Sequence, residues 1–356
     1  MAPRQEPEVV EVADAAFAVK TRAAERRDRL LYIAAAVALV VVVLLPLTST
    51  DQAQAAGLPL MVDRYWFRVA TTMAMFVAIA AAWNIIGGLT GYPAFGNVVY
   101  FGIGAYTVGM LVTKYHWTFA AALPFSFLLP AALASLIGIP LLRLRGHYFA
   151  VASLGVAVAV GELFNQLDYF GGAVGIFMPI VRSDLLFYYL MLGTAVLAVA
   201  ITWAVLHSRF GYGLIAIRED EGAAAVMGVN TTLYKIAAYA LSAALTGLAG
   251  GIYAQWNVFI NLDVAFNINV SIDSILMALI GGLGTIWGPV LGAIILEFLI
   301  QTFAGGGELA VLTQVGLGVL LTVAVIFLPR GVVDFFGGRS SFTIAYLRRT
   351  LRESGV

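Results

Sequence analysis

The chain has 356 residues, of which 61% are hydrophobic and only 11% charged, and its formal net charge is zero. Because soluble domains carry roughly 25% charged residues, this composition predicts an integral membrane protein. The zero net charge argues against nucleic acid as a partner, since phosphate binding needs a basic patch. No cysteine is present and the three histidines are scattered, which excludes cysteine chemistry and disfavours a metal site.

The chain begins with a polar segment of mixed charge, residues 1–29, which we interpret as a cytoplasmic N-terminal segment. An apolar run from Leu30 to Leu47 follows it. Ala53-Gln54-Ala55 resembles a signal-peptide cleavage site, but the leading segment is long and partly acidic. The apolar run is also long enough to span a membrane. We therefore expect an uncleaved first helix.

Apolar stretches of similar length recur along the chain, and a membrane-spanning helix needs about 20 mainly apolar residues. We expect an all-α polytopic membrane protein with about ten spans. They lie near 30–47, 66–86, 98–113, 117–142, 148–166, 184–206, 234–259, 271–284, 287–304 and 309–328. The eighth and ninth spans are short, so a single broken element is an alternative to two helices.

The positions of lysine and arginine indicate the orientation. With the N-terminus inside, 16 of the 20 basic residues fall on the inner side, and only Arg64, Arg68, Lys114 and Arg182 fall outside. Inner loops of membrane proteins carry such an excess, so both termini are expected in the cytoplasm. The transmembrane domain then covers 30–332, and 333–356 forms a cytoplasmic tail.

Glycine spacing predicts close packing between helices. Gly247 and Gly251, and likewise Gly284, Gly288 and Gly292, recur at intervals of four residues. This spacing places small residues on one helix face, where two backbones can approach each other.

Two similar glycine-rich strings, at 86–91 and 280–284, lie at the inner ends of predicted spans, and a proline follows each. Glycine and proline weaken a helix, and paired interruptions in the two halves of a transporter point to a translocation pathway. Chance similarity of short glycine-rich strings explains the pair equally well.

Ionisable side chains within the predicted spans are few, and they are functional candidates because a bilayer penalises them. Glu297 lies mid-span and is expected to face the bundle interior. Asp273 is expected at the outer start of its helix, where a carboxylate favours the positive end of the helix dipole. Glu162 lies toward the outer end of its span, and for Glu162 and Glu297 both structural pairing and substrate contact remain open. The candidates for the pathway are Asn84, Gly87, Gly88, Asn97, Glu162, Gly281, Gly282 and Glu297.

The polar loop at 207–235 separates two spans and is expected on the cytoplasmic side. We predict one helix from Gly213 to Met227, with Gly228 as its stop. Its alanine-rich apolar face indicates contact with a protein rather than with lipid, because insertion into lipid favours bulky side chains. That face consists of Leu214, Ile217, Ala224 and Ala225, beside a charged belt of Arg218, Glu219, Asp220 and Glu221.

None of the three lysines, Lys20, Lys114 and Lys235, follows a glycine. A phosphate-binding loop of the form Gly-x-x-x-x-Gly-Lys-Ser/Thr requires that order. If ATP drives this protein, another subunit hydrolyses it.

Several motifs together resemble one membrane subunit of the ABC importers for branched-chain amino acids, the subunit usually paired with a second homologous permease. The similarity covers about residues 80–332. The motifs are Gly102-Ile103-Gly104-Ala105-Tyr106, Arg143-Leu144-Arg145-Gly146-His147, Ser208-Arg209-Phe210-Gly211, Ala216-Ile217-Arg218-Glu219-Asp220-Glu221, Gly228-Val229-Asn230, Gly281-Gly282-Leu283-Gly284-Thr285, Trp287-Gly288-Pro289 and Pro329-Arg330-Gly331.

The resemblance implies a multi-pass subunit of the cell inner membrane, surrounded by lipid, that is not itself an enzyme. It implies a second permease, two ATPase subunits that hold ATP and Mg, and a periplasmic or lipid-anchored binding protein, with no cofactor in this chain. The helix at 213–228 would be the coupling helix. Its candidate coupling residues are Arg218, Glu219, Asp220, Glu221, Ala223, Ala224 and Gly228.

The sequence departs from the family pattern at two places. Glu221 lies one position before the glutamate of the Glu-Ala-Ala-x-x-x-Gly signature, which Gly222 replaces, and Ala173-Val174 replaces two small polar residues in an outer loop. Partner choice in that loop is therefore expected to differ. Import of urea, amides or aromatic acids remains an alternative, and a stand-alone channel or secondary carrier is a weaker one because the few acids form no relay.

Overall fold

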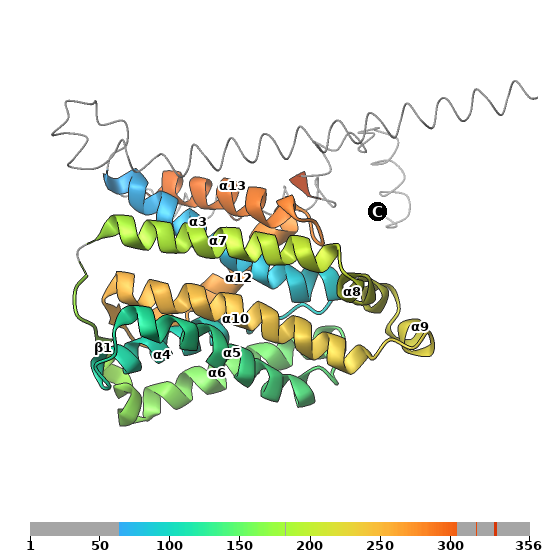
Figure 1. Cartoon of the computed structure of the whole chain (residues 1–356), viewed down its shortest axis with the longest axis horizontal. Helices are drawn as coiled ribbons and strands as arrows, with labels where there is room; N and C mark the ends of the chain where they lie inside the picture. The colour runs from blue at the N-terminus through green and yellow to red at the C-terminus, as the bar shows by residue number, and fades with distance from the viewer. Residues whose placement is uncertain (1–63, 182, 305–317, 319–330, 333–356) are drawn as a thin grey trace, which may run out of the picture. The chain divides into compact units, whose positions relative to one another are not determined.

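The computed structural model describes residues 64–181, 183–304, 318, 331 and 332 (Figure 1). Contacts divide the chain into two units, Met1–Phe67 and Arg68–Val356. Apart from residues 64–67, all described residues belong to the second unit, which is the subject below. The predicted N-terminal segment, the first span at 30–47, the tail at 333–356 and all but residue 318 of the tenth span lie outside the described residues.

Helices dominate the described part of the chain. The α-helices are α3 (Arg64–Asn84), α4 (Val98–Thr113), α5 (Phe119–Leu141), α6 (His147–Gln166), α7 (Asp184–Leu206), α8 (Arg209–Glu219), α9 (Glu221–Val226), α10 (Thr231–Asn257), α11 (Leu262–Ala265), α12 (Ile268–Gly281) and α13 (Trp287–Ala304). A π-helix, η2 (Ile85–Leu89), continues α3, and two 3-10 turns are η3 (Asp168–Phe170) and η4 (Gly172–Val174).

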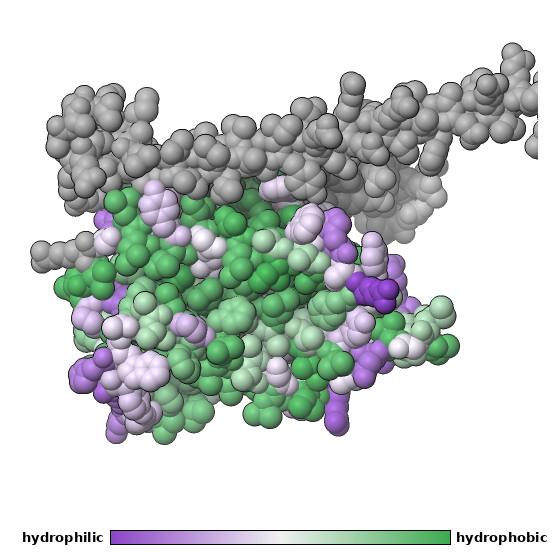
Figure 2. All heavy atoms as spheres, in the orientation of Figure 1, coloured by the Kyte–Doolittle hydropathy of each residue, from purple (hydrophilic) through white to green (hydrophobic). Residues whose placement is uncertain are grey.

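Six helices among the described residues are long and apolar enough to cross a membrane, and α4 and α13 are shorter apolar helices. Figure 2 shows apolar side chains over the middle of one face of the bundle and polar residues at its two ends. This pattern suits a hydrocarbon layer between two aqueous phases. The predicted all-α polytopic membrane fold is confirmed, and the eight spans predicted between 66 and 304 correspond to helices.

The core of the bundle is α10, which packs against α4 and α5. A Cβ atom added at Gly247 would lie 2.6 Å from the Ser126 carbonyl oxygen on α5, and one at Gly251 would lie 2.6 Å from the Ser126 Cβ. The four-residue glycine spacing therefore allows the close approach that the sequence predicts.

The eighth and ninth predicted spans are two helices, α12 and α13, packed against each other. The alternative of one broken element is therefore wrong. Gly292 faces the backbone of α12 at Met277, and Gly288 faces the backbone of Gly282 directly after α12, so both allow the close packing that the spacing predicts. Gly284 does not share this role, because it lies in the turn between the helices with φ +73°, a conformation that favours glycine.

Between η2 and α4 the chain runs through the protein interior without regular structure. The N–H groups of Phe95 and Gly96 donate to Ser153 Oγ of α6 at 3.1 and 3.3 Å, and Val98 N–H donates to Ser271 Oγ of α12 at 2.8 Å. Non-helical backbone is tolerated at membrane depth only where protein satisfies its polar groups. These two serines do so here.

At the end of the bundle opposite α8 and α9, two short strands join the loops that follow α6 and α10. The strands β1 (Ile176–Phe177) and β2 (Phe259–Ile260) pair antiparallel. Val174, in the loop where the sequence departs from the family pattern, is 76% exposed beside them.

Candidate functional site

The loop between α7 and α10 folds into two helices, α8 and α9, rather than the single helix predicted from Gly213 to Met227. Asp220 interrupts the predicted helix. The Asp220 backbone is extended, with φ −157°, and the Asp220 carboxylate accepts a hydrogen bond from Ala223 N–H at 2.9 Å. Aspartate is a strong N-cap, so a new helix begins there. The predicted stop is confirmed, since Gly228 follows α9 with φ +88°.

The two helices expose a different apolar surface from the one predicted. Of the four residues assigned to an exposed docking face, Leu214, Ile217 and Ala224 are buried against this chain, whereas Ala225 is exposed as predicted. The most exposed large apolar residues of the loop are Val226 and Met227, which are 88% and 84% exposed and are called the α9 tip below. Figure 1 shows α9 projecting beyond the adjacent ends of α8 and α10.

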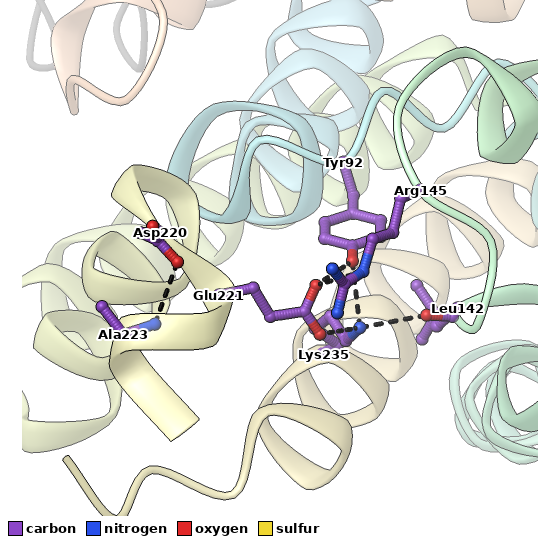
Figure 3. Close-up of polar contacts among 7 residues, drawn as sticks. All are labelled: Tyr92, Leu142, Arg145, Asp220, Glu221, Ala223 and Lys235. Carbon is purple, nitrogen blue, oxygen red and sulfur yellow. Dashed lines mark hydrogen bonds and ion pairs between the residues drawn. The ribbon is translucent and has the colours of Figure 1, made fainter. Parts of the chain in front are cut away.

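Glu221 points into a cluster with Tyr92, Leu142, Arg145 and Lys235 (Figure 3). Its carboxylate pairs with Lys235 Nζ at 2.6 Å and Arg145 Nε at 3.3 Å, and it accepts a hydrogen bond from the Tyr92 hydroxyl at 2.7 Å. Lys235 also donates to Tyr92 Oη and to the Leu142 carbonyl, both at 3.0 Å. We call these five residues the Glu221 cluster; the predicted charged belt therefore does not include Glu221.

Charge and burial act in opposition on the Glu221 carboxyl. Burial alone raises its pKa, but the hydrogen bonds from Lys235 and Tyr92 and the charges of Lys235 and Arg145 outweigh burial and lower the pKa below its ordinary value. Burial and the neighbouring carboxylate together raise the pKa of Tyr92. At neutral pH the cluster therefore holds an ionised Glu221 and a protonated Tyr92.

The two glycine-rich strings of the sequence meet at this end of the bundle. The Asn84 side chain accepts a hydrogen bond from Gly284 N–H at 2.8 Å and donates to the Thr285 carbonyl at 2.9 Å. Arg218 of α8 donates to the Gly88 carbonyl at 2.7 Å. We call the contact between 84–88 and 282–285 the glycine crossing. Gly87, Gly281 and Gly282 are buried in or beside it.

The remaining pathway candidates lie outside the glycine crossing. Asn97 is buried and donates to Thr246 Oγ1 of α10 at 2.9 Å, while its Oδ1 has no hydrogen-bond partner. Glu162 is exposed on α6, where it accepts a long hydrogen bond of 3.5 Å from Asn165.

The two acids of the last helices differ in how well the sequence predicted them. Glu297 is 2% exposed and accepts a hydrogen bond from Gln301 at 2.6 Å, so its predicted inward orientation is confirmed. The predicted helix-start position of Asp273 is wrong. Helix α12 begins at Ile268, where Asn267 caps it, and Asp273 lies in its second turn.

Sequence reasoning did not identify Tyr92, Arg145 and Lys235 as partners of Glu221, or Leu142 as an acceptor for Lys235. Their separations, from 14 to 129 residues, follow no helical or strand period. The one local signal is Lys235 itself, a lysine in the second turn of an apolar span. Such a residue requires an acceptor nearby.

The fold and the site define a polytopic membrane protein with a structured, projecting loop between two of its spans. Comparison with known proteins gives its family. The profile of the family described as branched-chain amino acid transport system / permease component matches residues 65–328. The chain therefore belongs to this permease family, whose members are transport components rather than enzymes.

Individual relatives agree with the family assignment. The high-affinity branched-chain amino acid transport system permease protein LivM of Salmonella typhimurium is 29% identical over 311 residues, which cover 78% of this chain and 72% of LivM. LivH of the same organism is 26% identical over 165 residues, 46% of this chain and 51% of LivH. The inner membrane ABC transporter permease protein YjfF of Escherichia coli is 30% identical over 161 residues, 42% and 47% of the two chains. No solved structure matches the chain.

Proposed function

We propose that this chain is the permease subunit of an ATP-binding-cassette importer that moves branched-chain or related amino acids into the cytoplasm. Two separate ATPase subunits, which hold ATP and Mg, would drive it, and a second homologous permease would complete the pore. The family profile and the similarity to LivM support the transport class. The similarity to YjfF, a named ABC transporter permease, supports the ATP-driven mechanism.

The α9 tip is the observation that carries the proposal of a docked ATPase. Two large apolar side chains, Val226 and Met227, are almost fully exposed on a loop that projects from the bundle. Exposed apolar groups of this kind mark interaction sites. Glu219 and Asp220, exposed close by, would be repelled by an anionic membrane surface. A groove on a protein is therefore the better partner.

The opposite end of the bundle offers a surface for a periplasmic or lipid-anchored binding protein. Val174, Phe177 and Ile180 are 76%, 70% and 69% exposed there. In this proposal the binding protein sets much of the selectivity, and the location is the cell inner membrane. Urea, short amides and aromatic acids are the alternative cargoes, which a ligand screen of the binding protein would distinguish.

Purification of the tagged chain in mild detergent from its own host tests the proposal. The unmodified chain should bring down two ATPases and a second permease. A variant with Val226→Asp and Met227→Asp should lose the ATPases, because an apolar contact would then bury two charges. The matched control is Val174→Asp, the same kind of change at the opposite end, which should retain the ATPases. Recovery of the chain alone, still transporting without ATP, would contradict the proposal.

A stand-alone carrier is the second candidate, and buried Glu297 is the observation that favours it. An acid enclosed in an apolar helix could bind a coupling ion. Transport that needs no ATP but is abolished by Glu297→Gln would support this alternative, whereas ATP-dependent transport by that variant would exclude it.

A further inference from the structure

The Glu221 cluster joins α9 to three other parts of the chain. Glu221 begins α9, Lys235 lies in the second turn of α10, Tyr92 follows η2, and Leu142 and Arg145 belong to the turn between α5 and α6. The 14 residues between Glu221 and Lys235 fold back so that the two charges meet at 2.6 Å. A displacement of α9 therefore acts on three other segments at once.

The hydrogen bonds of Lys235 make this attachment specific. A lysine ammonium has three donors, and all three are used, by Glu221, by Tyr92 and by the Leu142 carbonyl. The Lys235 side chain is only 6% exposed and that of Glu221 only 15%. A buried ion pair is favourable only when its geometry is good, and removal of one partner leaves an uncompensated buried charge. The two side chains therefore hold each other in one position.

Aromatic packing extends the contact from the cluster into the bundle. The Tyr92 ring packs edge-on against Phe149 of α6, with centroids 5.2 Å apart. Phe149 packs against Tyr239 of α10 at 6.2 Å, and Tyr239 packs against Tyr100 of α4 at 5.3 Å. These rings are almost fully buried, so the cluster rests on a close-packed core rather than on a loop.

We propose that the Glu221 cluster is the joint through which movement of α9 reaches the membrane-spanning helices, and that Glu221 and Lys235 are its positioning residues. The two ends of α9 then have separate tasks. The tip at Val226 and Met227 contacts the ATPase, and Glu221 transmits the displacement inward. This inference rests on the proposed function. It also accounts for the departure from the family signature, since Gly222, at the signature position, is exposed and Glu221 faces the core.

The test uses the full transporter, with its second permease, ATPases and binding protein, reconstituted in lipid vesicles. Three quantities are measured: the ATPases retained, the ATP hydrolysed, and the substrate moved per ATP. Glu221→Gln and Lys235→Met should each retain the ATPases, yet lower the substrate moved per ATP about tenfold, a typical size for a coupling free energy.

A double variant separates a joint from two independent structural roles. If Glu221 and Lys235 act as one unit, Glu221→Gln combined with Lys235→Met should lose no more than the worse single variant. Tyr92→Phe keeps both charged residues and the aromatic ring, so this variant should fold even if the charge variants do not. It should lower the substrate moved per ATP about threefold, through loss of one hydroxyl. The control Asp263→Asn, an exposed acid beyond the far end of α10, should change nothing.

Three results would contradict the proposal that the cluster is a joint. They are a normal amount of substrate moved per ATP in Glu221→Gln, losses of coupling that multiply in the double variant, and loss of the ATPases from either single variant. The last result would place Glu221 in the docking surface itself. The proposed function fails separately, and earlier, if the unmodified transporter retains no ATPase or transports without ATP.

Discussion

Besides its buried apolar residues, the projecting loop is joined to the spans by two polar attachments that differ in chemistry. At the Glu221 cluster, side chains from four segments meet around one carboxylate. At the glycine crossing, the Asn84 amide binds backbone groups of Gly284 and Thr285, and Arg218 joins the crossing to the loop through the Gly88 carbonyl. The first depends on charge, whereas the second depends on glycines small enough for two backbones to touch. A single loop can therefore be fixed in one place by electrostatics and in another by shape.

Removal of both attachments should have the largest effect. Arg218→Ala combined with Glu221→Ala takes away the donor to Gly88 and leaves Lys235 without its anion. Loss of one partner of a buried pair alone costs about 3–5 kcal/mol. We expect the free energy of unfolding in detergent to fall by at least that much, with transport uncoupled. A double variant no less stable than Arg218→Ala alone would show that the cluster does not stabilise the loop.

The glycine crossing should respond next most strongly, to Asn84→Ala. The change leaves Gly284 N–H and the Thr285 carbonyl without their partner, and each buried unsatisfied group costs about 1–3 kcal/mol. Thermal unfolding would measure the loss. The control is Asn257→Ala, which removes an exposed asparagine that donates to the Phe259 carbonyl, and it should destabilise less because water can replace the lost bond. Equal losses in the two variants would assign the effect to something other than these bonds.

Low pH should weaken the Glu221 cluster and leave the glycine crossing unchanged. Because the folded-state pKa of Glu221 lies below its ordinary value of 4.5, its contribution is complete above that value and is lost as the pH falls through the lowered pKa. The groups facing it are Tyr92, Arg145 and Lys235, and protonation of Glu221 removes the negative charge on which its ion pairs with Lys235 and Arg145 depend.

The chain has no cysteine, so one spin label at Met227→Cys would report on α9 alone. The label should become more mobile only well below pH 4.5, while a label at Thr285→Cys should not change over that range. Release of α9 near neutral pH would contradict the lowered pKa.

The smallest effect is expected from Arg145→Gln. The Arg145 side chain is 73% exposed, and its 3.3 Å contact with Glu221 is the longest of the cluster. Exposed ion pairs contribute about 0–1 kcal/mol, and salt screens them. Unfolding at low and high salt should show a small loss that disappears as salt is added. A loss as large as that of Glu221→Ala would mean that Arg145, rather than Lys235, holds the carboxylate.

Asp220 shows what local pattern reading missed although the signal was present. An aspartate three residues before an N–H that it can cap is a local feature, and it divides α8 from α9. The apolar periodicity from Leu214 to Ala225 continued across it and predicted one helix. The wrong exposure predicted for three of the four face residues followed from that error, because Leu214, Ile217 and Ala224 are buried while Ala225, Val226 and Met227 are exposed.

The sequence by itself determined the membrane fold, the position of most spans, the inward orientation of Glu297 and the close packing at Gly247 and Gly251. Apolar length and residue spacing are local quantities, and a bilayer leaves few alternatives to helices. Only the tertiary structure decided that Glu221 meets Lys235 and Tyr92, and that the two glycine-rich segments touch through Asn84. Such contacts join residues as far as 200 positions apart, and no period along the chain encodes them. They arise when buried charges and backbone groups find partners as the helices pack.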